Sequence, residues 1–221
     1  KVSPPTLKVG IIGYRSWIAE HLMEELLQDP HTFLAYHGKS PDSVFIADYS
    51  DLDCLYVFAG RARPTDVEMA DERLLLNKLA HHPRPPRKMV YLSSLAVNDH
   101  TPYGMHKKMC EAILNDNDGR NIIMVRAAAV FGPGQPADSS MLVPTIAREG
   151  LDFEPVNPNK LTKFISVFAL VDHLAFLADG YDFSYCGQPA SGIDVGGTFT
   201  ASPQQILDLW TTFEHYRVAP P

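Results

Sequence analysis

The sequence has few cysteines, no long apolar run and no excess of positive charge. Its three cysteines, Cys54, Cys110 and Cys186, are widely spaced, which fits neither a disulfide framework nor a zinc site. The nine histidines are scattered as well, so we expect no metal site. No apolar stretch approaches the roughly 20 residues that cross a bilayer, so we expect no membrane partner. The net charge of −7 argues against a nucleic-acid partner, whose binding surface would be basic.

The first residues also lack a targeting signal. Residues 1–8 contain no hydrophobic signal-peptide core, so a cytoplasmic location is the expectation. Apolar residues make up 45% of the chain and charged residues 20%, which is typical of globular proteins and excludes a disordered chain. The length of 221 residues predicts one domain, with at most a small appendage.

Short β-rich runs alternate with helical patterns over the first 131 residues. The expected strands are 7–12, 33–36, 43–47, 54–59, 89–92 and 122–126, and the expected helices are 17–28, 66–79 and 103–114. Residues 81–88 hold three prolines and are predicted to form a loop. Strands that alternate with helices indicate parallel βαβ units, so we predict an α/β fold with a doubly wound, Rossmann-like parallel sheet.

The pattern loosens after residue 131. The expected helices here are 141–148, 171–178 and 203–215, and the expected strands are 164–168 and 193–195. Ser202 is a candidate cap of the last helix, with Gln205 at its third position. We interpret residues 1–131 as mainly a dinucleotide-binding core. Residues 132–221 are then a reduced substrate lid with late sheet and helix elements, at the carboxyl edge of the sheet where such folds bind ligands.

The turn after the first strand is a candidate cofactor site. Such a turn presents backbone N–H groups and a helix N-terminus to a pyrophosphate. The candidate residues are Gly13, Arg15, Ser16, Trp17 and Ile18. Gly13 suits a tight turn, whereas Ser16 stands where a second glycine would allow the closest approach of a phosphate. An ordinary strand-to-helix turn explains these residues equally well.

The segment after the second expected strand indicates which dinucleotide would bind. Residues 36–40, YHGKS, contain no acid for a ribose hydroxyl. Lys39 and Arg15 are suited instead to the 2′-phosphate of NADP. They favour NADP over NAD. The alternative interpretation is that Lys39 is an ordinary solvated lysine of a loop.

A candidate catalytic set lies near residue 100. Ser93 and Ser94 end a strand, and Tyr103 and Lys107 share one face of a predicted helix. A nearby ammonium stabilises a phenolate and lowers the pKa of a tyrosine, which can then exchange a proton with a hydroxyl or carbonyl. A serine hydroxyl beside it can hold the substrate oxygen. An exposed tyrosine–lysine pair without function is the alternative.

In their order along the chain, these motifs resemble the extended short-chain dehydrogenase/reductases, a group of nucleotide-sugar epimerases, dehydratases and reductases. The resemblance covers about residues 8–209. Gly13-x-x-Ser16-x-x-Ala19 resembles the family's glycine turn, and residues 90–97, VYLSSLAV, followed by Tyr103-x-x-x-Lys107 resemble its catalytic segment.

Further positions carry the same resemblance. Asp48 resembles the acid after the third strand that contacts adenine. Ala59 and Gly60 resemble the small residues that line the cofactor at the end of the next strand. Arg15 resembles the turn arginine of reductases that use NADP.

The resemblance implies roles for the catalytic set. Tyr103 would be the acid/base, Ser94 would orient the substrate oxygen, and Lys107 would bind the nicotinamide ribose and lower the tyrosine pKa. Hydride would pass between the cofactor and a carbinol or carbonyl carbon of a polar small molecule such as a nucleotide sugar. Leu95 and Ala96 replace the acidic pair of the dehydratases, which leaves oxidoreduction or 4-epimerisation.

Two alternatives remain open. The substituted turn at Ser16 and the short lid also fit a non-catalytic NAD(P)-binding or scaffold protein that retains the fold. Helices 66–79 and 103–114 form the usual dimer surface of the resembling family, and they carry Met69, Leu74 and Met109. We therefore expect a homodimer, unless these three residues face the sheet instead.

Overall fold

The structure is a computed structural model. It describes residues 6–61, 64–116, 120–136, 142–149, 158–178, 192–195 and 199–208. Cys186 and residues 209–215 of the expected last helix lie outside the described residues.

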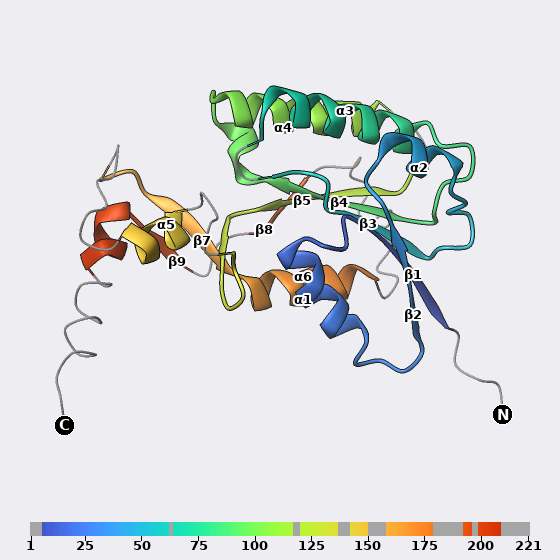
Figure 1. The fold of residues 1–221 in the computed structure, drawn as a ribbon, viewed down its shortest axis with the longest axis horizontal. Coiled ribbons are helices and arrows are strands. Elements are labelled where there is room, and N and C mark those ends of the chain that lie inside the picture. Colours follow the sequence, from blue (N-terminus) through green and yellow to red (C-terminus); the bar gives the residue numbers. More distant parts are fainter. Residues whose placement is uncertain are drawn as a thin grey trace.

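Six parallel strands form the main sheet, in the order β2-β1-β3-β4-β5-β8 (Figure 1). The strands are β1 (Leu7–Ile12), β2 (Thr32–His37), β3 (Cys54–Val57), β4 (Met89–Ser94), β5 (Ile122–Ala127) and β8 (Ile193–Val195). All four residues of β3 are buried, as expected for a central strand of a sheet that is covered on both faces. The predicted doubly wound α/β fold is confirmed.

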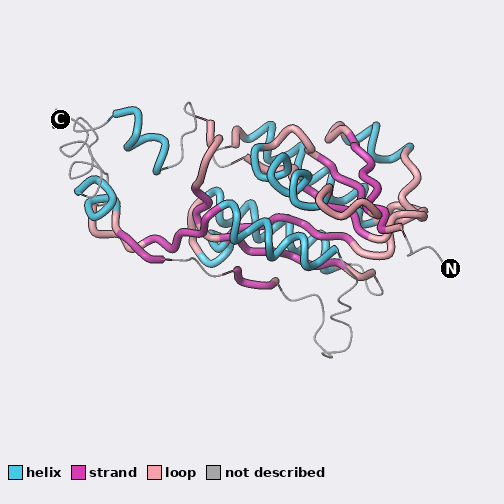
Figure 2. Tube along the Cα trace, turned by 90° about the horizontal axis from the view of Figure 1, so that it is seen from below, coloured by secondary structure: helices cyan, strands magenta, loops and turns pink. Residues whose placement is uncertain are grey.

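Helices form a layer on each face of this sheet. One layer holds α2 (Pro41–Ile46), α3 (Asp66–Ala80) and α4 (Pro102–Asn115), and the other holds α1 (Trp17–Leu26) and α6 (Val167–Ala178). The view from below shows α1 and α6 side by side over the strands (Figure 2). No helix in the described ranges is long and apolar enough to span a membrane.

Capping residues fix the starts of several helices. The Ser16 side chain accepts a hydrogen bond from the Ala19 amide at 3.3 Å, and Thr101 caps α4. Residues 203–208 are helical, and Ser202 and Gln205 form the predicted reciprocal capping pair, with bonds of 2.8 and 3.2 Å. Because these caps set where α1 and α4 begin, they also set the positions of the candidate site residues.

One expected strand is wrong. Residues 43–47 were predicted as β-structure, but they fall in the short helix α2 and just after it. Pro41 occupies the first turn, where its fixed φ favours a helix start, and Ser43 donates a hydrogen bond back to the Ser40 carbonyl. Of the apolar residues in α2 only Val44 is buried. A short helix needs only this one buried side chain, whereas a strand would need several along one face. As a result, β2 is an edge strand of the sheet.

A smaller sheet lies beyond the main one. It consists of β6 (Ala129–Phe131), β7 (Thr162–Ser166) and β9 (Phe199–Ala201). The helix α5 (Leu142–Glu149) lies between β6 and β7 in the sequence. We did not predict β6 or β9, and the strand expected to reach Phe168 ends two residues earlier, because Val167 already begins α6. The rings of Phe131, Phe164 and Phe199 contact one another and hold the three strands together.

Candidate active site

A cavity of about 800 Å³ opens at the carboxyl ends of the main strands. Its walls come from the segments that follow β1, β3, β4 and β5, and from the start of β7 in the small sheet. A doubly wound sheet binds ligands at this edge, because the connections there diverge and leave a crevice. The cavity is therefore the candidate active site.

The cavity brings together seven of the predicted site residues. They are Ser16, Trp17, Ile18, Gly60, Ser94, Tyr103 and Lys107. Five others do not line it, namely Gly13, Arg15, Lys39, Asp48 and Ala59. The proposed catalytic set and the start of α1 are thus gathered in one place, whereas Arg15, Lys39 and Asp48, which were predicted to meet the adenosine end of the cofactor, lie outside this cavity.

The β1–α1 turn has the geometry of a tight turn. Gly13 has a φ of 78°, and a Cβ at this position would lie 2.2 Å from the Phe58 carbonyl oxygen, so a side chain there is excluded. Trp17 Nε1 donates a hydrogen bond of 2.8 Å to the Pro133 carbonyl, and His21 Nε2 lies 3.1 Å from the same oxygen. These contacts tie the start of α1 to the segment after β6.

The predicted adenosine-end residues lie on the surface. Lys39 and Arg15 are exposed, and the Arg15 guanidinium lies 5.5 Å from the centre of the Tyr14 ring. Asp48 follows a helix, which corrects the expectation that it follows a strand. Its carboxylate accepts a 2.7 Å hydrogen bond from Ser50 and pairs with Arg84. The roles of these residues toward a cofactor stay predictions.

The two serines at the end of β4 point in different directions. Ser93 is buried and its hydroxyl donates a 2.6 Å hydrogen bond to the Glu111 carboxylate. Ser94 is half-buried and caps the short 3-10 helix η1 (Leu95–Asn98), accepting a bond from the Ala96 amide at 3.2 Å. Of the two hydroxyls, that of Ser94 is therefore the better placed to meet a ligand.

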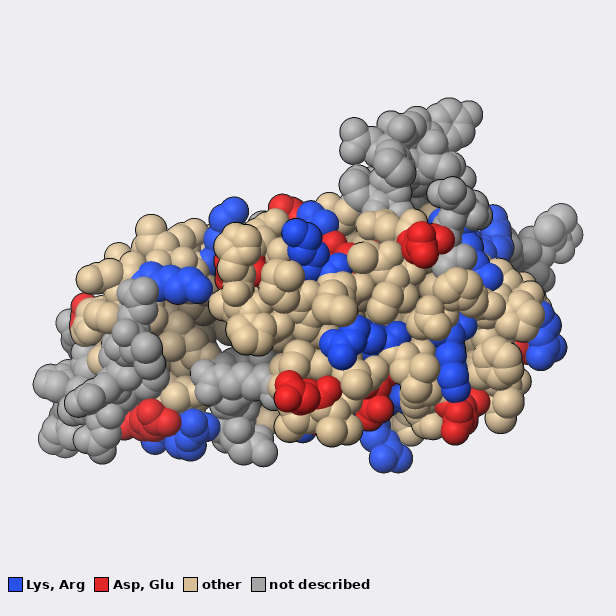
Figure 3. All heavy atoms as spheres, turned by 90° about the horizontal axis from the view of Figure 1, so that it is seen from above, with Lys and Arg blue, Asp and Glu red and all other residues tan. Residues whose placement is uncertain are grey.

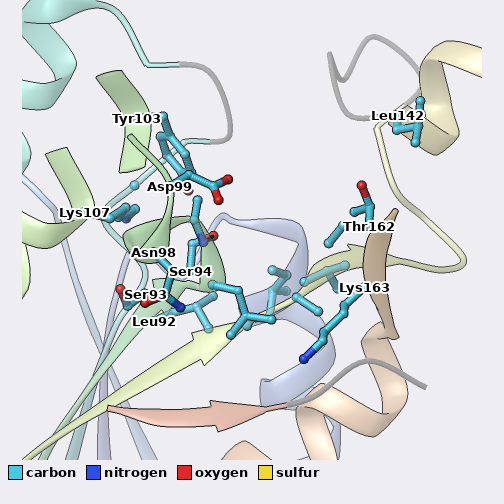
Figure 4. Close-up of a pocket in the computed structure, with 18 of the residues that line it drawn as sticks. Leu92, Ser93, Ser94, Asn98, Asp99, Tyr103, Lys107, Leu142, Thr162 and Lys163 are labelled. Carbon is cyan, nitrogen blue, oxygen red and sulfur yellow. Dashed lines mark hydrogen bonds between the residues drawn. The ribbon is translucent and has the colours of Figure 1, made fainter. Parts of the chain in front are cut away.

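Tyr103 stands at the start of α4 and faces the small sheet across the cavity. In Figure 4 it lies beside Asp99, with Ser94 on the same side, whereas Thr162 and Lys163 stand on the opposite side. Asp99 also approaches Lys160 at 3.8 Å, which joins the two sides of the cavity by an ion pair. The phenol of Tyr103, the hydroxyl of Ser94 and the side chain of Lys163 therefore surround a single space.

Lys107 is almost fully buried, with 3% of its surface exposed. Its Nζ donates hydrogen bonds to Glu72 Oε1 at 2.8 Å and to Tyr91 Oη at 2.9 Å, and it lies 5.9 Å from the centre of the Tyr103 ring. Burial alone would lower the pKa of Lys107, but its neighbours, Glu72 foremost and then Tyr103 and Cys110, together raise this pKa above its ordinary value. The side chain is therefore an ammonium at neutral pH.

Two more side chains in the same cluster donate hydrogen bonds to Glu72. Tyr91 Oη and His106 Nε2 each donate to its carboxylate at 2.8 Å. Burial would raise the pKa of Glu72, but His106, Lys107 and Tyr91 together lower it to about 2. Because Arg73 donates to His106 Nδ1 at 3.0 Å, the imidazole proton is on Nε2, where it points at Glu72.

Glu72, His106 and Cys110 also lie close enough to suggest a metal site, with ligand atoms within 4.8 Å of one another. Two positive groups already face this cluster, because Arg73 occupies His106 Nδ1 and Lys107 occupies Glu72 Oε1. Burial raises the pKa of the Cys110 thiol to about 12, which opposes the thiolate form that binds metals. The chemistry of these donors fits a hydrogen-bond network better than a cation site.

Sequence reasoning missed Glu72, Tyr91 and His106. A signal for Glu72 was present, because Leu75, Leu76 and Leu79 follow it at helical spacing and are buried, so Glu72 lies on the buried face of α3. The sequence contains no comparable signal for Tyr91, because its pattern does not distinguish it from an ordinary strand residue. Nor was there one for Asp99 or Lys160, whose meeting depends on where the small sheet lies.

Searches with the sequence found no matching protein-family model and no matching curated protein. Solved structures do match. A UDP-glucuronic acid 4-epimerase from Bacillus cereus, in complex with UDP-glucuronic acid and NAD, is 16% identical with a TM-score of 0.70, over 97% of this chain and 84% of that one. A GDP-6-OMe-4-keto-L-xylo-heptose reductase from C. jejuni is 12% identical with a TM-score of 0.77, over 97% and 85%.

The capsular polysaccharide assembling protein CapF from Staphylococcus aureus matches as well. It is 17% identical with a TM-score of 0.68, and the match covers 96% of this chain but 59% of the CapF chain. The chain thus has the fold of these epimerases and reductases, as its resemblance to the extended short-chain dehydrogenase/reductases implied. At these identities the likeness shows the fold alone.

Proposed function

We propose that this chain is an NAD(P)-dependent oxidoreductase or epimerase of the extended short-chain dehydrogenase/reductase type. The main support is the cavity, which gathers Ser94, Tyr103 and Lys107 with the start of α1. Ser94 ends β4, and Tyr103 and Lys107 lie on the following helix α4, whereas the start of α1 is far from all three in the sequence and meets them only through the fold. The matched epimerases and reductases favour a sugar nucleotide as the substrate.

The residues present fit a nicotinamide dinucleotide. Gly13 and the first turn of α1 offer backbone amides suited to a pyrophosphate, and Gly60 leaves a wall without a side chain beside Lys107. When bound, the nicotinamide ring supplies the hydride acceptor or donor. Lys107 would hold the nicotinamide ribose, with Tyr103 and Ser94 on the substrate side of the cavity.

Within this proposal, the protein side chains transfer the proton and orient the substrate. The Tyr103 phenol gives a proton to a substrate carbonyl in reduction, and its phenolate takes one from a carbinol in oxidation. Ser94 holds the same oxygen by a hydrogen bond. Lys163 reaches toward the cavity from the small sheet and suits the diphosphate of a sugar nucleotide (Figure 4).

The cofactor preference is a separate proposal. Four of the matching solved structures, all of 4-epimerases, contain NAD, which suits 4-epimerisation by oxidation and re-reduction. In this chain, the exposed Arg15 and Lys39 near the ends of β1 and β2 favour the extra phosphate of NADP, and hence a reductase. We propose NADP as the cofactor on the charge of these two residues.

Calorimetric titration with NADPH and NADH tests both proposals. We expect NADPH to bind more tightly, and we expect Lys39→Ala to lower its affinity by about tenfold, the effect of one lost charge-assisted contact. Lys8→Ala is the matched control, because Lys8 pairs with Asp51 near the start of β1, whereas Lys39 follows the carboxyl end of β2, the edge of the sheet where the cavity opens. Tighter NADH binding would favour an epimerase. Binding of neither would overturn the oxidoreductase proposal and favour a scaffold protein.

We also propose that the chain forms a homodimer through α3 and α4. Leu74 and Met109 are about half exposed on the outer side of these helices, and Met105 is exposed beside them, whereas Met69 is partly buried. From above, this face shows charges of both signs separated by broad uncharged areas (Figure 3). A second copy of the same surface would cover these apolar side chains.

A further inference from the structure

A buried ion pair lies directly against Gly60 in the wall of the cavity. Lys107 on α4 and Glu72 on α3 are 3% and 4% exposed, and their charged atoms are 2.8 Å apart. A Cβ on Gly60 would lie 2.5 Å from Lys107 Nζ and 2.8 Å from Glu72 Oε1. The missing side chain at residue 60 therefore leaves the space that the ion pair occupies.

We propose that Glu72 is a positioning residue that keeps Lys107 protonated and fixes its ammonium group beside Tyr103. This inference rests on the proposed function, in which Lys107 is the cation of the site. Glu72 touches neither the substrate nor the cofactor in this scheme, and it acts only through Lys107.

The groups that face Lys107 come from several elements. They are Glu72 from α3, Tyr91 from β4, and Tyr103 and Cys110 from α4 itself. Burial raises the pKa of Cys110 to about 12 and that of Tyr91 well above its ordinary value, so both are neutral near pH 7. Among these neighbours Glu72 supplies the negative charge. A lysine this deeply buried would otherwise lose its proton readily, because desolvation disfavours the charged form.

Glu72 is itself held in place. Tyr91 and His106 donate to its two oxygens, and Arg73 fixes the His106 ring from the other side. An ammonium has three hydrogens, of which Lys107 gives one to Glu72 and one to Tyr91. The third remains for a ligand in the cavity, in a direction that the other two bonds determine.

The test measures the protonation of Lys107 directly. Correlation spectra of ¹⁵N-labelled lysine ammonium groups are recorded against pH without cofactor, and Lys107→Met assigns the signal. In Glu72→Gln, which keeps the side-chain shape, we expect the Lys107 signal to titrate at lower pH than in the wild type. Glu111→Gln is the control, because Glu111 is a similarly buried carboxylate that bonds Ser93 and Arg126, and we expect this variant to leave the Lys107 titration unchanged. An unchanged Lys107 titration in Glu72→Gln overturns the proposal.

Activity gives a second readout. We expect the alkaline limb of the kcat/KM profile of Glu72→Gln to move to lower pH, with a loss of about 100-fold above it, the usual scale for a misplaced catalytic contact. The ammonium spectra require no turnover. Failure to bind either dinucleotide therefore refutes the proposed function, whereas an unshifted ammonium signal refutes this inference alone.

Stability measurements keep the inference testable if Glu72→Gln folds poorly. An uncompensated buried charge destabilises a protein strongly, whereas removal of both partners leaves no such charge. We therefore expect the double variant Glu72→Gln, Lys107→Met to be more stable than Glu72→Gln. A double variant that is no more stable would show that Glu72 does not compensate Lys107.

Discussion

At the scale of single residues, neighbouring side chains of the same type can have different functions. Ser93 and Ser94 both line the cavity, but the Ser93 hydroxyl is committed to Glu111, which also forms a bidentate pair with Arg126. Strand alternation explains the difference, because successive side chains point to opposite faces of the sheet. Ser93 therefore faces α4, and Ser94 faces the end of the strand and the cavity.

Substitution of each serine separates the two roles. We expect Ser94→Ala to lower kcat/KM by about 10- to 100-fold, because one hydrogen bond to the reacting oxygen is lost, while stability falls by about 1 kcal/mol with the loss of the η1 cap. Ser93→Ala should instead lower stability by about 2 kcal/mol, the usual range for a bond to a buried carboxylate, with kcat/KM nearly unchanged. Urea denaturation and steady-state kinetics measure both effects. A larger loss of activity in Ser93→Ala would assign the substrate to the other hydroxyl.

At the scale of elements, the β1–α1 turn fixes the distance between two strands as well as the start of a helix. Gly13 packs against the backbone of Phe58, just beyond β3, so any side chain at residue 13 would push the ends of β1 and β3 apart. The same turn delivers Ser16 and Trp17 to the cavity. The tight turn is thus a requirement of the fold, whether or not a phosphate binds there.

Gly13→Ala tests this requirement. We expect it to lower the free energy of unfolding by more than about 2 kcal/mol, because it combines a positive φ of 78° with a 2.2 Å contact to backbone. Gly38→Ala is the control, because its Cβ would meet only Ser43 Oγ at 3.4 Å, and we expect a change within about 0.5 kcal/mol. Thermal or urea unfolding compares the two variants. Equal effects would mean that the turn can relax around a methyl group.

Much of the arrangement of elements could be predicted from the sequence. The alternation of apolar strands with amphipathic helices predicted β1, α1, β3, α3, β4, α4 and β5 because burial on both faces leaves a strong local pattern. The segment 43–47 failed because a short apolar run fits a strand or one helical turn, and Pro41 decides between them. The strands β6 and β9 have three residues each and pair only over long range, so they leave little local signal.

The candidate site was predictable to the same extent. Motif order brought Ser94, Tyr103 and Lys107 together in the prediction, and the structure places all three around one cavity. The buried partners of Lys107 were not predicted, because Glu72 and Tyr91 meet it only through the packing of α3 and α4 on β4. Asp48 shows the opposite error, because its predicted role depended on a strand expected at 43–47, where the structure has the helix α2.

At the scale of the whole molecule, the two faces of the main sheet are covered unequally. The side with α1 and α6 also carries the contact of Trp17 and His21 with the segment after β6, and Phe168 of α6 packs on His21. The outer surface of α3 and α4 leaves Leu74, Met105 and Met109 between 45% and 51% exposed. Because the cavity opens at the edge of the sheet and not through these helices, a second copy could cover them without closing the site.

Light scattering at tens of micromolar tests this dimer. We expect a mass near twice the 24.5 kDa of the chain for the wild type. Met109→Glu and Leu74→Glu should each shift the mass toward the monomer, since an unpaired charge buried in an apolar contact weakens association by several kcal/mol, or more than about 100-fold. Phe33→Glu is the control, because Phe33 is equally exposed, at 57%, but lies on the edge strand β2 away from α4. A wild-type protein that remains a monomer at these concentrations would exclude the α3–α4 interface, and a dimer broken only by Phe33→Glu would move the interface to the edge of the sheet.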